Sequence, residues 1–331
     1  RRGVVDPIRM IEGAMSQSRP VQFGIVIPAF RATRTIVSTL DAIVAQTLPP
    51  ISVVVVIDGP DPELEELVVE HRLHCEVVVL PENTGGPGTP RNVGAASLCA
   101  RPDIEAIWFL DDDDLPAPDV LAVMAETLRS HPDDMFVCSS FRNWDEASPR
   151  ELGEIQSAAR PASRELELDW YLANTGAVLP SFSVIRVEAL RLLDHHGGRF
   201  HPALTHNQDY EVFVRLFHLV ESRRVDWCGG DYRIRASSLS ADVARAWSCR
   251  MQTDLILADW FESKSIPKMC QTFRRRSGSA ARRAARERWH AGDRTTAAKS
   301  LLRRGTIGLD FKAMVVLASL VLGFERPSRR A

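Results

Sequence analysis

The chain has 331 residues, 45% of them hydrophobic and 25% charged, with a formal net charge of −2. These values are typical of globular proteins and exclude a disordered chain, a collagen-like fibre and a disulfide scaffold. The six cysteines form no C-x-x-C pair, which argues against a zinc ribbon or a redox motif and predicts a reducing, cytoplasmic environment. We expect no signal peptide, and the length predicts two domains or one large domain with an appendage.

Strands and helices are expected to alternate over the first 140 residues. Short apolar runs predict strands at 24–28, 51–57, 76–80, 106–110 and 135–140, and amphipathic segments predict helices at 35–46, 62–73, 91–99 and 118–130. The run ISVVVVI is apolar on both faces, as in a central parallel strand. This pattern predicts an α/β fold with a mostly parallel sheet flanked by helices, whose ligands bind at the carboxyl ends of the strands.

Charge divides the chain into two parts. Residues 264–331 carry 17 Lys and Arg against 4 Asp and Glu, whereas residues 1–263 carry 24 against 39. The sequence therefore predicts an acidic body followed by a basic appendage. The appendage has a helical pattern, rich in Ala and Arg over 273–304, which we expect Gly278 and Gly292 to interrupt.

Four consecutive aspartates, Asp111 to Asp114, follow a predicted buried strand. Their mutual repulsion is unfavourable unless a cation binds near them. Alternate residues of an extended backbone share a face, so Asp111 and Asp113 can reach a common site, and carboxylate oxygens suit Mg²⁺ or Mn²⁺. The alternative is a solvated acidic loop that caps the next helix, but the position of the run at a strand end favours the metal site.

Three further motifs stand at strand or helix ends. The Gly-rich loop at 83–92 is either a plain turn or a phosphate loop, for which Arg91 near a helix start is suited. Asp58 ends the most apolar strand, where it can accept a hydrogen bond from a nucleobase N–H or simply form an Asp-Gly turn. Asp209 precedes an amphipathic helix, where it can serve as the N-cap, as a general base, or as both.

In chain order these motifs resemble those of glycosyltransferase family 2, which are inverting enzymes with the GT-A fold. The matching segments are V-I-P-A-F at 26–30, V-V-I-D-G at 55–59, G-G-P-G-x-x-R-N-x-G at 85–94, F-L-D-D-D-D-x-P at 109–116, Q-D-Y-E-x-x-x-R at 208–215 and Y-R-I-R-x-x-S-L-S at 232–240. The resemblance implies an N-terminal extension at 1–20, a catalytic domain at 21–245 and a basic helical region at 246–331. Within the catalytic domain, it implies a nucleotide-binding half at 21–140 and an acceptor half at 141–245.

The resemblance also assigns roles to individual residues. The donor-binding residues that it implies are Pro28, Ala29, Phe30, Asp58, Arg91, Asp111, Asp112 and Arg235. Among these, Asp58 would contact the base, Arg91 would lie by the base or the diphosphate, and Asp111 would lie near the ribose. Asp111 and Asp113 would form the D-x-D pair that holds Mg²⁺ or Mn²⁺, and Asp209 would be the catalytic general base.

The chain departs from the family pattern at three positions. Ile57 replaces the first of two acids at the end of the second strand, and Gln208 replaces a glutamate before the base. Arg235 stands where the family often has a histidine near the diphosphate. Because an arginine neutralises phosphate but does not ligate a metal, the metal would depend more on Asp113 and on the phosphates.

The expected activity is therefore metal-dependent, inverting transfer of a sugar from a nucleotide diphosphate sugar to a hydroxyl of a saccharide, a lipid-linked molecule or a small molecule. Such a reaction belongs to polysaccharide, glycolipid or glycoconjugate synthesis. The alternatives are a sugar nucleotidyltransferase, whose G-G-x-G-T-R loop resembles residues 85–91, and a degenerate glycosyltransferase-like binding module.

The basic region admits three interpretations. It is a solvated helical cap, or it contacts an anionic membrane through its arginines and the apolar run at 311–324, which is too short for an ordinary membrane span. Nucleic acid binding is disfavoured because the arginines lack interleaved aromatic residues. We expect a cytoplasmic protein, free or peripheral at the inner face of the membrane.

Overall fold

The computed structural model describes residues 19–146, 152–156, 164–234, 242–293 and 296. The chain divides into two compact units. One comprises Arg1–Ala203 with Gln208–Arg235, and the other comprises Leu204–Asn207 with Ala236–Ala331. Most of the expected N-terminal extension at 1–20 lies outside the described residues.

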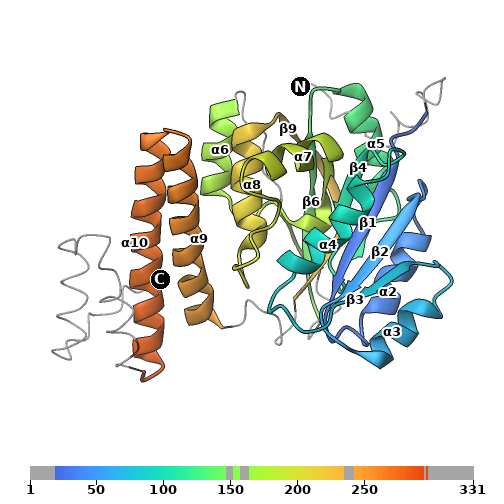
Figure 1. Ribbon diagram of the computed structural model, residues 1–331, viewed down its shortest axis with the longest axis horizontal. Coiled ribbons are helices and arrows are strands. Elements are labelled where there is room, and N and C mark those ends of the chain that lie inside the picture. Colours follow the sequence, from blue (N-terminus) through green and yellow to red (C-terminus); the bar gives the residue numbers. More distant parts are fainter. Residues whose placement is uncertain (1–18, 147–151, 157–163, 235–241, 294–295, 297–331) are drawn as a thin grey trace. The chain divides into compact units, whose positions relative to one another are not determined.

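Four parallel strands form one half of the sheet in the first unit, in the order β3-β2-β1-β4 (Figure 1). These strands are β1 (Phe23–Ala29), β2 (Ser52–Ile57), β3 (Glu76–Val79) and β4 (Ala106–Phe109). The helices of this half are α2 (Ile36–Val44), α3 (Pro62–Val69), α4 (Gly88–Cys99) and α5 (Val120–Ser130). All of these elements were expected from the hydrophobic pattern. Helix α4 begins three residues before its predicted start, because a proline is tolerated in the first turn of a helix.

The other half of the sheet is mixed, with the strand order continuing β4-β8-β6-β9-β5. Its strands are β5 (Leu115–Pro116), β6 (Phe136–Asp145), β7 (Leu152–Gln156), β8 (Ser183–Arg186) and β9 (Ser222–Ile234). Strand β8 is antiparallel to both β4 and β6, whereas β6 and β9 are parallel. The helices here are α6 (Arg164–Ala173), the 3-10 helix η1 (Pro180–Phe182), α7 (Val187–His195) and α8 (Gln208–Leu219). The sequence pattern did not assign most of this half, but the α/β fold class is confirmed.

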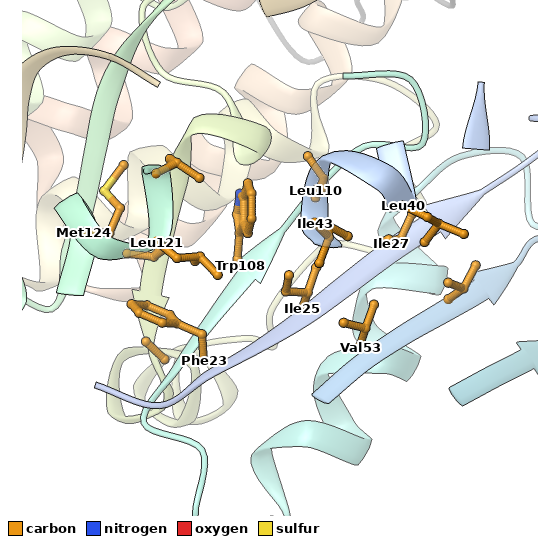
Figure 2. Close-up of a cluster of buried hydrophobic side chains, with 14 of the residues drawn as sticks. Phe23, Ile25, Ile27, Leu40, Ile43, Val53, Trp108, Leu110, Leu121 and Met124 are labelled. Atoms are coloured by element: carbon orange, nitrogen blue, oxygen red, sulfur yellow. The ribbon is translucent and has the colours of Figure 1, made fainter. Parts of the chain in front are cut away.

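A hydrophobic core packs against the parallel half of the sheet (Figure 2). Every residue of β1 is buried, so both of its faces are covered. The side chains of this cluster include Phe23, Ile25, Ile27, Leu40, Ile43, Trp108, Leu121 and Met124. The one polar atom of the Trp108 ring is satisfied, because Nε1 donates to the Ser181 carbonyl at 2.9 Å. This packing fixes the carboxyl ends of β1, β2 and β4 relative to one another.

Helix α4 lies very close to β1 because of a glycine. A Cβ placed on Gly94 would lie 2.5 Å from Cγ1 of Val26, closer than any real contact. The close approach fixes the helix that carries Arg91 against the central strand of the parallel half. Gly94 therefore has a packing role in the site's scaffold.

The second unit contains a pair of long helices, α9 (Val243–Ser263) and α10 (Pro267–His290), which lie side by side (Figure 1). The expected interruption at Gly278 is wrong, because this glycine is buried inside α10. Several alanines are also buried on that helix, and small residues let two helices approach closely. Gly292 does follow the end of α10, in a left-handed conformation. Within the described residues, no helix has the length and apolar character to span a membrane.

Candidate active site

The aspartates after β4 are held individually by other strands and loops. The backbone N–H of Asp111 donates to Ser181 Oγ at 3.1 Å. The backbone N–H of Phe30, at the end of β1, donates to Oδ2 of Asp112 at 3.0 Å. The second bond joins the ends of the neighbouring parallel strands β1 and β4, and the first ties the run to η1, so the acid run is held at the sheet edge.

Strand β9 holds the other end of the acid run. The backbone N–H of Arg233 donates to Oδ1 of Asp114 at 3.0 Å, and Arg233 Nε donates to the Asp113 carbonyl at 2.8 Å. The guanidinium of Arg233 also stacks on Trp144, 4.6 Å from the ring centroid. Asp114 is fully buried, and this burial, together with the nearby charges of Asp113 and Asp111, raises its pKa well above the ordinary value for aspartate. Several carboxyl groups therefore lie close together here, and a bound cation would relieve the repulsion among those that are ionised.

Arg91 lies beneath one of these carboxylates. The residue is only 2% exposed, and its Nη2 lies 2.5 Å from Oδ1 of Asp111. The guanidinium also stacks on the Phe200 ring, 5.3 Å from the centroid. Its Nε and Nη1 have no hydrogen-bond partner within the described part of the chain. The structure thus brings Arg91 to Asp111, where it orients the carboxylate.

Asp58, at the end of β2, is held by the Gly-rich loop that follows β3. Its Oδ1 accepts bonds from the backbone N–H and the hydroxyl of Thr84, at 2.8 and 2.9 Å. Its Oδ2 accepts a longer bond of 3.4 Å from the Asn83 amide. Sequence reasoning singled out neither Thr84 nor Asn83, although both stand in the loop that the parallel pairing of β2 and β3 brings to this edge.

A cavity of about 420 Å³ opens beside Asp58. Its wall includes Phe30, Arg31, Asp58, Asp61 and Asn83. Arg31 has a positive φ of 53°, and its guanidinium lies 5.0 Å from the centroid of the Phe30 ring. Two other residues that the resemblance placed in a nucleoside pocket, Pro28 and Ala29, are buried within β1 and are not among the residues that line this cavity.

Asp209 lies in the first turn of α8, because that helix begins at Gln208. It is therefore inside the helix and not at the N-cap position. A Cβ on Gly88 would lie 3.6 Å from Cγ of Gln208, so the starts of α4 and α8 approach each other. The side chain of Asp209 is half-buried.

Tyr232 is a partly buried phenol whose pKa responds to the charges of Asp209 and of the acid run. Burial raises the pKa of its phenol, and the charges of Asp114, Asp111, Asp113 and Asp209 raise it further. The ring also packs edge-on against Phe141, with centroids 6.1 Å apart. Sequence reasoning gave Tyr232 no role. Arg235, which it placed at the diphosphate, lies outside the described residues.

Comparison with known proteins identifies the family. Residues 24–193, half of the chain, match the sequence model described as glycosyl transferase family 2. The chain belongs to glycosyltransferase family 2. The expected family is thereby confirmed, and the match argues against the sugar nucleotidyltransferase alternative.

Two curated relatives align with part of the chain. The poly(ribitol-phosphate) beta-N-acetylglucosaminyltransferase TarS of Staphylococcus aureus is 28% identical over 121 residues, which are 35% of this chain and 20% of TarS. The glycosyltransferase GlyG of Streptococcus pneumoniae serotype 4 is 21% identical over 214 residues, which are 61% of this chain and 66% of GlyG. The matched region thus spans about a fifth of the length of TarS.

Solved glycosyltransferase structures share the fold. Residues 1–349 of S. aureus TarS superpose with a TM-score of 0.57, 15% identity and coverage of 92% of both chains. The same fragment in complex with UDP-GlcNAc gives a TM-score of 0.53 at 17% identity, covering 92% of this chain and 93% of TarS 1–349. The mannosyltransferase PcManGT from Pyrobaculum calidifontis, in complex with GDP-Man and Mn²⁺, gives 0.52 at 15% identity, covering 95% of this chain and 91% of PcManGT. The expected GT-A fold is confirmed.

Proposed function

We propose that this chain transfers a sugar from a nucleotide diphosphate sugar to an acceptor hydroxyl, with inversion at the anomeric carbon and with the aid of Mg²⁺ or Mn²⁺. The observation that carries the proposal is geometric: Arg91 on α4 holds Asp111 of the acid run, and the start of α4 lies against the start of α8, which carries Asp209. We assign the acid run to the donor side and Asp209 to the acceptor side. The complexes of related folds with UDP-GlcNAc and with GDP-Man and Mn²⁺ support the same assignment.

On the donor side, Phe30 and Asp58 at the cavity would hold the base, with Pro28 and Ala29 supporting the wall from β1. Asp111 and Asp112 would face the ribose and the start of the diphosphate. Each carboxylate is already oriented, by Arg91 and by the Phe30 backbone. Such orientation before binding lowers the entropic cost of holding the donor.

The carboxylates suit a divalent metal that is shared with the substrate. Among the described residues, no group of three or more His, Cys, Asp or Glu side chains is placed to hold a metal ion. Two carboxylates, Asp111 and Asp113, would therefore hold Mg²⁺ or Mn²⁺ together with donor phosphates, as is usual for Mg²⁺. When bound, such an ion supplies positive charge to the leaving diphosphate. Asp209, on α8, would take the proton of the attacking hydroxyl on the acceptor side.

Calorimetric titration of UDP, dTDP and GDP, each with Mn²⁺ and with EDTA, tests this proposal. We expect at least one nucleotide to bind, and to bind at least about tenfold more weakly in EDTA, because the metal offsets repulsion between phosphates and carboxylates. Asp113→Asn should remove most of the difference in nucleotide affinity between Mn²⁺ and EDTA, whereas Asp103→Asn, at an exposed position, should leave that difference unchanged. If no nucleotide binds in either condition, the chain is the degenerate binding module and the proposal fails.

We further propose that the protein is cytoplasmic and contacts the inner face of the membrane through α10. One face of α10 is buried, and the opposite face carries exposed basic residues at spacings of 7 and 11, which align along a helix: Lys268, Arg275 and Arg286. These three make no ion pair within the described residues. The other exposed arginines are engaged, Arg274 with Glu262 at 2.8 Å and Arg283 with the Trp247 ring. The six cysteines are all free thiols, as suits a reducing compartment.

Vesicle sedimentation tests the membrane contact. Each basic residue near an anionic surface strengthens binding about fivefold. The double variant Arg275→Ala/Arg286→Ala should therefore partition about 25-fold more weakly onto vesicles that contain phosphatidylglycerol, and neither form should bind neutral phosphatidylcholine vesicles. The matched control is Arg72→Ala/Arg101→Ala, which removes the same charge from the other unit. Equal losses in the two double variants would contradict a role for α10.

A further inference from the structure

Most of the hydrogen-bonding capacity of Asp58 is already used within the protein. An ionised carboxylate offers about four acceptor positions, two on each oxygen. Both positions on Oδ1 are filled by Thr84, through its backbone N–H at 2.8 Å and its hydroxyl at 2.9 Å. Among the residues that the structure describes, Oδ2 accepts only the 3.4 Å bond from Asn83. One acceptor position, on Oδ2, is therefore left for a ligand.

Of the two bonds that Thr84 donates to Asp58, only the one from the hydroxyl depends on the identity of the side chain. The hydroxyl has a single proton, and its two acceptors in reach are Asp58 Oδ1 at 2.9 Å and the Gly86 carbonyl at 3.3 Å. The shorter bond takes the proton. The loop itself is held separately, because the backbone N–H of Gly85 donates to Oδ1 of Asn83 at 2.8 Å. A change at the Thr84 hydroxyl can therefore alter Asp58 without releasing the loop.

Asp58 is 4% exposed and lines the cavity at the end of β2, so a base in that cavity meets a carboxylate with one open acceptor position. Guanine presents two adjacent donors, a ring N–H and an exocyclic NH₂, and satisfies both only if both carboxylate oxygens accept. Uracil and thymine present a single ring N–H between two carbonyl groups. A buried donor without an acceptor weakens binding strongly.

We infer that Thr84 leaves Asp58 with a single open acceptor position, so that this site selects a uracil or thymine nucleotide over a guanine nucleotide. The inference rests on the proposed nucleotide site and names its substrate class. The fold alone does not determine which nucleobase is bound, since structures with this fold are known with UDP-GlcNAc and with GDP-Man.

Calorimetric titration of UDP and GDP in the presence of Mn²⁺ tests the inference in the wild-type protein and in Thr84→Val. Valine has the shape of threonine and keeps the backbone N–H bond, but it opens one position on Oδ1. We expect the wild type to bind UDP at least tenfold more tightly than GDP. The ratio should fall about tenfold in Thr84→Val and stay within about twofold of wild type in Thr84→Ser, which keeps the hydroxyl.

A matched control is Thr47→Val, which removes an exposed hydroxyl from the same unit and should leave the ratio unchanged. Equal unfolding midpoints of Thr84→Val and the wild type would show that the variant is folded. Wild-type binding of GDP as tight as that of UDP would overturn the inference while leaving the nucleotide site intact. An unchanged ratio in Thr84→Val would overturn the role of Thr84, and absence of binding by every nucleotide would overturn the proposed function together with the inference.

Discussion

Replacing Asp209 with asparagine is expected to slow sugar transfer by about 10²–10⁴-fold, the usual contribution of a general base. Asparagine has the shape of aspartate but cannot accept a proton from the attacking hydroxyl. Asp209 lies in the first turn of α8 and is not among the residues that line the cavity beside Asp58. Donor affinity should therefore stay within about threefold of the wild-type value, because the lost interaction belongs to the transition state.

The measurement is release of UDP from UDP-GlcNAc with saccharide acceptors, paired with calorimetric titration of UDP. The same assay with dTDP- and GDP-sugars covers the other donor classes. Asp169→Asn is the matched control, because it makes the same chemical change at an exposed position on α6. Turnover of Asp209→Asn within a few-fold of the wild type would show that another group accepts the proton. A parallel loss of UDP binding would place Asp209 in the donor site instead.

The parts of the site at the ends of parallel strands could be predicted from the sequence. Asp58 and Asp111 each follow a short apolar run, and the carboxyl ends of such runs meet at one edge of an α/β sheet. Strands β1, β2 and β3 pair with their neighbours in the chain, and β4 adds to the other side of β1, the reversal of strand order that is general in open α/β sheets, so local pattern and general topology sufficed. The same logic identified the loop that contains Arg91 but not the partner of that arginine.

The contacts that complete the site join segments that are far apart in the sequence. Arg233 reaches Asp114 only because β9 pairs in parallel with β6 and runs past β5. Ser181 reaches Asp111 because η1 precedes β8, the antiparallel neighbour of β4. No periodicity in the chain encodes such pairings. The buried position of Gly278 was missed for the same reason, since its environment is set by a neighbouring helix and not by its own helical propensity.

Replacing Arg91 with methionine is expected to weaken donor binding by about 100-fold, within the range found when one member of a buried charge pair is truncated. Methionine keeps much of the apolar length of the arginine side chain but leaves Asp111 without its cation. Asp111 would then lose its fixed orientation, and the negative charge of the acid run would increase. The measurement is the UDP affinity in Mn²⁺, with Arg101→Met as the matched control, because that arginine pairs with Asp103 at the protein surface.

The double variant Arg91→Met/Asp111→Asn determines how Arg91 acts. Its Nε and Nη1 are buried as well as unpartnered in the described structure, so a donor phosphate does not reach them in this arrangement. If Arg91 acts through Asp111, the double variant should bind UDP about as weakly as the weaker single variant, because both changes remove one interaction. Losses that multiply would instead mean that the guanidinium moves on binding and touches the diphosphate itself. The buried guanidinium favours the first outcome, in which α4 contributes to donor binding by holding a carboxylate in place.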